Sequence, residues 1–132
     1  MENPTLDLIH RHTSARHYKT EPLPASVIET IITAPQCASP SSNLQTYSVV
    51  IATDAGKRVH LSEMCGNQAH IRGSPVFLAW CADLATLERV YQLRGYTQVT
   101  VYAKNFLIAA LDVSIAAQNA ALSAESLRLS IC

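Results

Sequence analysis

The sequence predicts a single domain that combines two short strands with several helices, one of which is long and apolar. Three observations support this prediction. The 132 residues are enough for one domain with a modest core. Segments rich in β-branched residues alternate with segments of helical periodicity. From about residue 102 to residue 127, apolar side chains occupy several faces of a predicted helix.

The first half of the chain predicts a helix, a loop and a strand, in that order. A short amphipathic helix is expected between Pro24, a suitable first-turn residue, and Pro35, which cannot continue it. Residues 38–44, ASPSSNL, have the composition of a loop. Residues 46–52, TYSVVIA, are rich in β-branched side chains and predict a buried strand.

The next segment repeats these element types. A helix capped at residues 53–54 should run to about Gly66. Residues 74–82, SPVFLAWCA, predict a second short apolar strand. Asp83 should cap an amphipathic helix that ends near Gly95.

The long apolar helix is the most informative structural feature. At 1.5 Å per residue it would be on the order of 40 Å long, so a domain of this size could not bury all its faces, and a subunit interface would cover the rest. A membrane span is the alternative, but Asp112 lies inside the segment, and a central Asp costs about 2.5–3.5 kcal/mol on insertion scales. Residues 96–103, YTQVTVYA, alternate like a strand, which leaves the start of the helix open.

Composition and cysteine usage narrow the function classes. Hydrophobic residues make up 48% of the chain and charged residues 15%, while ten basic and ten acidic side chains give no net charge, which argues against nucleic-acid binding. The start, MENPTLDLIH, lacks the pattern of a secretory signal, so we expect a cytoplasmic protein. The cysteines form no C-x-x-C pair and are interpreted as reduced, buried structural thiols; a metal site at Cys65 with His60 or His70 is not favoured. They are Cys37, Cys65, Cys81 and Cys132.

A polar cluster near the N-terminus, in RHTSARHYKTEPLP, is the best candidate for an anion site. Arg16 offers a planar fork of donors, His12 and His17 offer ring N–H groups, and Thr13 and Ser14 offer hydroxyls. Together these groups suit the oxygens of a phosphate. The alternative is a solvated basic strip on the surface.

Four segments in order resemble the flavin-dependent nitroreductase family, in its NADPH-linked nitroreductase and flavin reductase branch. They are HTSARHYKTEPLP, ASPSSNLQTYSVVIAT, GNQAHIRGSPVFLAWCADL and DVSIAAQNAALSAESLRL. The resemblance implies an incomplete α+β, nitroreductase-like fold. Residues 1–132 would form the N-terminal part of the family domain, with the long central helix at a homodimer interface and two FMN sites shared between subunits.

The resemblance also implies site residues. His12, Ser14 and Arg16 match the positions that hold the FMN phosphate and ribityl chain, while Thr13 stands where the family usually has Arg and so removes one cation. In the second segment Ser41 is the best candidate for a polar flavin contact, ahead of Asn43 and Gln45. Gln68 matches the glutamine that reaches the flavin from the other side of the cleft. Both residues also have an explanation without a flavin contact: Ser41 as a turn former and Gln68 as an exposed amide near a helix cap.

The implied activity is hydride transfer from NADPH or NADH through FMN to a nitroaromatic, quinone or flavin acceptor. No catalytic residue is assigned, because the flavin carries the chemistry and the protein positions it. The implied partners are a second subunit and a small-molecule acceptor, with no nucleic acid and no membrane. Family members continue past Cys132, and Arg128 and Ser130 replace usual glycines. The alternative is therefore a catalytically inactive remnant that acts as a dimerising or flavin-binding module.

Overall fold

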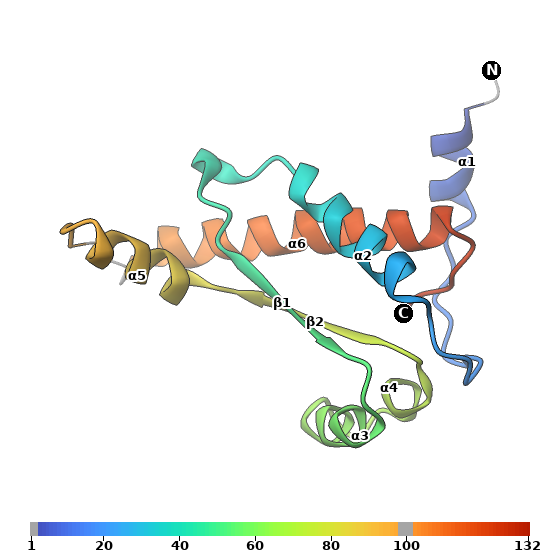
Figure 1. Ribbon diagram of the computed structural model, residues 1–132. Coiled ribbons are helices and arrows are strands. Elements are labelled where there is room, and N and C mark those ends of the chain that lie inside the picture. The colour runs from blue at the N-terminus through green and yellow to red at the C-terminus, as the bar shows by residue number, and fades with distance from the viewer. Residues whose placement is uncertain (1–2, 98–101) are drawn as a thin grey trace.

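The computed structural model describes residues 3–97 and 102–132, and one helix runs across the whole molecule (Figure 1). The helices and strands, with η for a short 3-10 helix, are α1 (Pro4–His10), α2 (Ala25–Thr33), η1 (Ala34–Cys37), η2 (Ser41–Asn43), β1 (Tyr47–Ala52), α3 (Ala55–Met64), α4 (Ala69–Gly73), β2 (Phe77–Ala82), α5 (Leu84–Leu93) and α6 (Ala103–Ser126). The elements α1, α2, η1, η2, β1, β2 and α5 all contact α6. The mixed architecture of helices with a small sheet is as predicted.

One face of α6 forms the centre of the fold. Its buried residues recur every three or four positions: Ala109, Asp112, Ala116, Ala120 and Ala124. This spacing places them in one stripe along the helix. Because alanine is small, neighbouring elements can approach the helix backbone closely along this stripe.

The opposite side of α6 is not buried within this chain. Leu107 and Leu111 are 58% exposed and Ile115 is 41% exposed, while Phe106, near the N-terminal end of the helix, is 64% exposed. This agrees with the expectation that a domain of this size could not bury every face of the helix. The other described elements cover the alanine stripe and leave these larger side chains at the surface.

A small apolar core lies between α6, α2 and the sheet. Ile31 of α2 packs with Ala120 and Ala124 of α6, and all three are buried. Partly buried side chains complete this core: Val27, Leu78, Trp80, Leu129 and Ile131. The last two follow α6, so the C-terminal residues turn back onto the core that the helix creates.

Strands β1 and β2 form a two-stranded antiparallel sheet, with a register from Tyr47 opposite Ala82 to Ala52 opposite Phe77. The chain between them forms α3 and α4, which pack on each other beyond one end of the sheet (Figure 1). The strand prediction is confirmed, but burial of the first strand is not, because Val50 is 54% exposed. A sheet of only two strands has too few neighbours to cover both faces.

Asp83 joins the end of the sheet to α5. Its carboxylate accepts hydrogen bonds from the Thr86 backbone N–H at 2.9 Å and the Thr86 hydroxyl at 2.8 Å, and it also accepts one from the Ser48 hydroxyl of β1. These bonds, that from Ser48 first, lower the pKa of Asp83 below its ordinary 3.8. The predicted cap is confirmed, and it also fixes α5 to the neighbouring strand.

The other helix predictions are confirmed with small differences. Helix α2 begins at Ala25, with Pro24 as its N-cap rather than its first residue. Asp54 caps α3 by accepting from the Lys57 backbone N–H at 2.9 Å. Gly95 follows α5 with a φ of 76°, which glycine adopts readily. The predicted strand-like alternation of residues 96–103 lies partly outside the described residues.

Two helices and the state of the cysteines differ from expectation. Helix α1 was not expected, although Asn3 caps it by accepting from the Thr5 backbone N–H at 3.0 Å. The five-residue helix α4 is too short to give a periodic signal. The interpretation of the cysteines as buried is wrong for this chain, because all four are free and exposed.

The Ser-rich loop before β1 is held against α6 by one buried carboxylate. Asp112 is 1% exposed. Its Oδ1 accepts from the Ser41 backbone N–H at 2.8 Å, and its Oδ2 accepts from the Thr46 backbone N–H at 3.3 Å and the Thr46 hydroxyl at 3.1 Å. A buried carboxylate needs such donors to offset the loss of water. The interactions explain how an Asp is accommodated in an apolar helix.

We expect Asp112→Ala to lower the free energy of unfolding by several kcal/mol. Thr46 is 2% exposed, and each buried donor left without an acceptor costs about 1–3 kcal/mol. Urea unfolding would measure the loss, and amide exchange at Ser41 and Thr46 would locate it. Asp112→Asn keeps one acceptor oxygen and should cost less. Ser114→Ala, on an exposed position of α6, is the control. Equal urea midpoints for Asp112→Ala and this control would contradict the stabilising role of Asp112.

Candidate functional site

The predicted phosphate-binding segment lies beside the C-terminal end of α6. It follows α1 as irregular chain, and the Ala15 backbone N–H donates to the carbonyl of Ile131 at 2.7 Å. The Tyr18 hydroxyl donates to the Ala15 carbonyl at 2.7 Å. Burial, and to a smaller degree the nearby Cys132, raise the pKa of Tyr18. These bonds fix the backbone of the segment between the body of the fold and the C-terminal residues.

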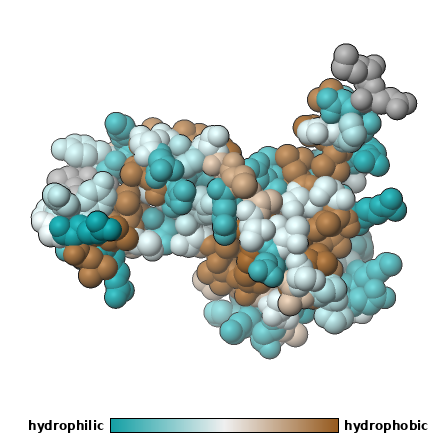
Figure 2. Space-filling view, turned by 45° about the horizontal axis from the view of Figure 1, so that its top comes forward, coloured by the Kyte–Doolittle hydropathy of each residue, from teal (hydrophilic) through white to brown (hydrophobic). Residues whose placement is uncertain are grey.

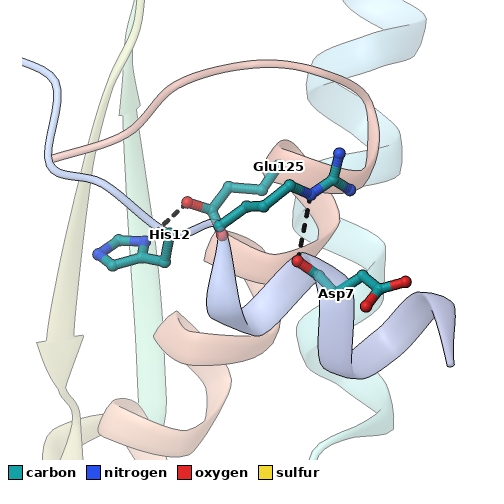
Figure 3. Close-up of polar contacts among 4 residues, drawn as sticks. Asp7, His12 and Glu125 are labelled. Atoms are coloured by element: carbon teal, nitrogen blue, oxygen red, sulfur yellow. Dashed lines mark hydrogen bonds and ion pairs between the residues drawn. The ribbon is translucent and has the colours of Figure 1, made fainter. Parts of the chain in front are cut away.

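The side chains of this segment remain at the surface. Thr13, Ser14 and Arg16 are exposed, so their donors are accessible to a ligand. His12 is also exposed, but its Nδ1 lies 2.7 Å from Oε1 of Glu125 near the end of α6. Figure 3 shows the imidazole ring and this carboxylate directed toward each other. The segment therefore presents a cation and two hydroxyls, together with an imidazole that a carboxylate orients.

Before this segment, the side chain of Arg11 contacts the backbone of α1. Its Nε donates to the carbonyl of Asp7 at 3.1 Å, and Figure 3 draws this bond to the labelled Asp7. A hollow of about 520 Å³ is lined by Pro4, Asp7, His10 and Arg11, all from α1 and its cap. It includes none of the predicted flavin contacts, so we do not assign the cofactor to it.

The loop that carries Ser41 has an unusual backbone. Ser42, Asn43 and Gln45 have φ values of 55°, 54° and 52°. Left-handed backbone costs a non-glycine residue about 1–2 kcal/mol, so this loop needs external support. The bonds from Ser41 and Thr46 to Asp112 supply it. The side chains of Ser41, Asn43 and Gln45 are exposed.

A smaller pocket adjoins this loop. Its volume is about 210 Å³, below the roughly 300–1,000 Å³ of small-molecule sites. Its lining residues are Leu44, Gln45, Tyr47, Asp83, Thr86, Leu87 and Val90. Burial, with a smaller effect of the Asp112 charge, raises the pKa of Tyr47. Of the predicted contacts, this pocket includes only Gln45.

Gln68 lies at the turn between α3 and α4. Its side chain is exposed, and its carbonyl accepts from the Ser62 hydroxyl at 2.8 Å. The preceding residues Gly66 and Asn67 have φ values of 75° and 60°, which sharpen the turn. The backbone thus fixes the position of Gln68 and leaves its amide at the surface.

The structure does not bring the three predicted groups together within one chain. The segment 12–16 contacts α6 near Glu125, whereas the Ser41 loop contacts it at Asp112. Thirteen residues of helix separate these points, about 20 Å along the axis. Gln68 lies beyond the sheet, next to α4 (Figure 1). The three groups therefore lie at separate places along the fold.

Metal-ligand geometry is absent from the part of the chain that the structure describes. Within residues 3–97 and 102–132, no group of three or more His, Cys, Asp or Glu side chains could hold a metal ion. His60 instead lies 3.8 Å from the Glu63 carboxylate on the exposed side of α3.

Sequence reasoning missed two residues that organise the candidate site. Asp112 was noted only as an obstacle to membrane insertion, although a lone carboxylate in an apolar helix signals buried donors nearby. Glu125 lies 113 positions from His12, and no local pattern connects them. Only the fold brings this pair together.

Comparison with known proteins identifies a matching family. Residues 9–132 match the description "Nitroreductase family". The chain is 33% identical to the FMN reductase (NADPH) of Bacillus subtilis over 132 residues, which covers 98% of this chain and 53% of the relative.

Two solved structures share the fold. The NfrA1 structure from B. megaterium superposes with a TM-score of 0.95 at 33% identity and covers 98% of this chain and 53% of its own. The NADPH:FMN oxidoreductase from Vibrio harveyi complexed with NAD+ gives a TM-score of 0.85 at 37% identity, and the match covers 95% of this chain and 53% of that one. The chain spans about half the length of the curated relatives it matches. It belongs to the nitroreductase family, and its fold is an incomplete nitroreductase-like fold.

Proposed function

We propose that this chain is part of an FMN-dependent oxidoreductase that passes hydride from NADPH or NADH to a small-molecule acceptor. The observation that carries the proposal is the exposed segment 12–16 at the end of α6, where Arg16 and two hydroxyls are accessible in a chain of this family. Nitroaromatics, quinones and free flavins are the proposed acceptor classes. The names of the relatives above, an FMN reductase and an NADPH:FMN oxidoreductase, support the same cofactors.

The proposed roles of the site residues are binding and orientation. Bound FMN would accept and release the hydride. Arg16, Ser14 and His12 would hold the phosphate and ribityl chain by charge-assisted and neutral hydrogen bonds, with Thr13 as a weaker hydroxyl contact. Ser41 and Gln68 would contact the flavin. No described side chain is assigned as a catalytic acid, base or nucleophile.

A homodimer would complete these sites. The three predicted groups lie apart in one chain, so a second copy is the simplest source of the missing contacts. Figure 2 shows hydrophobic side chains gathered in several patches on one face of the molecule. Helix α6 exposes four large apolar side chains: Phe106, Leu107, Leu111 and Ile115. Monomeric proteins rarely expose apolar patches larger than a few hundred Å².

Helix α6 is, among the described residues, long and apolar enough to cross a membrane by length and composition. Core helices of soluble proteins pass the same test. The buried Asp112, with donors from the Ser41 loop, and the elements packed on the alanine stripe favour a protein core. We therefore propose a cytoplasmic dimer, where NADPH and NADH are available.

The test compares two proteins. One is the 132-residue chain, and the other is the extended chain, defined as these residues followed by the second half of the Bacillus subtilis relative. After incubation with FMN and desalting, the extended chain should be yellow and should oxidise NADPH with a nitroaromatic acceptor. The 132-residue chain should lose FMN, because fewer donors would replace the water around the phosphate. An extended chain that folds but neither retains FMN nor turns over would refute the proposal in favour of an inactive remnant.

In the extended chain, Arg16→Ala should weaken FMN binding by about 10 to 150-fold. Hydrogen bonds to charged groups contribute about 1.5–3 kcal/mol, which corresponds to that range. Titration by quenching of flavin fluorescence would measure it. Lys19→Ala removes an exposed cation just outside the segment and is the matched control. An unchanged dissociation constant for Arg16→Ala would remove the phosphate role.

Ile115→Asp should dissociate the dimer of the extended chain. It would bury an unpaired charge at the proposed interface, a change that costs several kcal/mol. Light scattering without detergent would give the mass, and far-ultraviolet circular dichroism would show that the helices persist. Gln92→Asp on the exposed side of α5 should leave the mass unchanged. A folded monomer before mutation, or a need for detergent, would contradict the proposed interface.

A further inference from the structure

The contact between His12 and Glu125 has features that a surface ion pair lacks. The Nδ1 to Oε1 distance is 2.7 Å, which is short for a hydrogen bond from nitrogen. The Glu125 side chain is only 11% exposed, whereas that of His12 is 49% exposed. The carboxylate is therefore largely withdrawn from water, while about half of the His12 side chain is exposed to it.

The chemistry of this pair determines which ring nitrogen carries the proton. An ionised carboxylate only accepts hydrogen bonds, so Nδ1 of His12 must donate to it. The other nitrogen, Nε2, is then the only ring atom left to contact a ligand. The position of a histidine proton is set by the hydrogen bond that the second nitrogen makes.

A carboxylate beside an anion site would by itself oppose phosphate binding. The arrangement avoids this if the imidazole lies between the two anions and donates to both. The Nδ1–H would point to Glu125 and the Nε2–H to the phosphate, so the cationic ring would offset the carboxylate charge. The bond from Ala15 to Ile131 holds the same segment three residues further on and limits movement of the ring away from Glu125.

We propose that Glu125 is a positioning residue for the FMN phosphate: it engages the Nδ1–H of His12, so that Nε2 is the ring nitrogen presented to the anion and donates to it from the doubly protonated ring. This inference rests on the proposed function and extends it to a residue that contacts no ligand itself. The competing explanation is that the pair only attaches the N-terminal segment to α6. The two explanations predict different effects of a Glu125 variant on the binding of a flavin that lacks the phosphate.

The first experiment needs no flavin. Long-range nitrogen–proton correlation spectra of the histidine-labelled 132-residue chain would report the proton position on His12. We expect Nδ1 of His12 to carry a proton in the wild type, alone in the neutral ring and together with Nε2–H in the doubly protonated ring, whereas in Glu125→Ala the neutral ring should shift toward the Nε2–H form. Glu63→Ala, which removes the exposed partner of His60 at 3.8 Å, should leave the His12 signals unchanged. A wild-type His12 that carries its proton only on Nε2 would overturn the proposal.

The second experiment compares FMN with riboflavin, which lacks the phosphate, in the extended chain. Glu125→Ala should weaken FMN binding about 10-fold or more and leave riboflavin binding unchanged. Glu125→Gln keeps an acceptor oxygen and should recover part of the loss. His12→Gln places an amide near Nε2 and should bind FMN better than His12→Asn, whose amide lies near Nδ1.

The outcomes separate the two proposals. Equal weakening of FMN and riboflavin by Glu125→Ala would show a purely structural role and overturn the inference, with the proposed function intact. A wild-type extended chain that folds but binds neither flavin would overturn the proposed function itself. In that case the spectra of the flavin-free chain still show whether Glu125 sets the proton position of His12.

Discussion

The buried carboxylate of Asp112 is the interaction on which the arrangement of this chain depends. It lies in the middle of a helix face made otherwise of alanines, where an unpaired charge would be untenable. The donors of Ser41 and Thr46 resolve this problem, and in doing so they fix a loop with three left-handed residues that would otherwise be strained. Thr46 leads directly into β1, so the same contact also fixes where the sheet begins on α6.

The two sides of α6 have different consequences for the molecule. The alanine stripe lets other elements approach closely, but it contributes little apolar area per residue, and the core around Ile31 is correspondingly small. The larger side chains Leu107 and Leu111 lie on the uncovered side. These side chains therefore remain available for contacts outside the described chain. A helix of this kind is better suited to the centre of an assembly than to that of a small monomer.

Local signals in the sequence predicted most of the fold, whereas the contacts that organise the site depend on long-range packing. The caps at Asp54 and Asp83 act on residues three positions away, so a short window contains both partners. The same reasoning found the exposed segment around Arg16 because its donor types are contiguous. This reasoning could not find the pairing of His12 with Glu125, because the two residues are 113 positions apart and meet only in the folded chain. The predicted burial of the first strand was wrong for a related reason: the sequence pattern shows that a segment is apolar, but not what covers it.

Helix α6 also couples the two parts of the candidate site that it holds. Asp112 fixes the Ser41 loop and Glu125 orients His12, and the intervening helix is a stiff spacer of about 20 Å. Neither group can shift toward a ligand without moving the helix or breaking a contact to a carboxylate. Such a site is ordered before the ligand binds, which reduces the entropy lost on binding. For a protein whose proposed role is to hold a cofactor rather than to supply a catalytic side chain, fixed placement is the principal contribution that the chain can make.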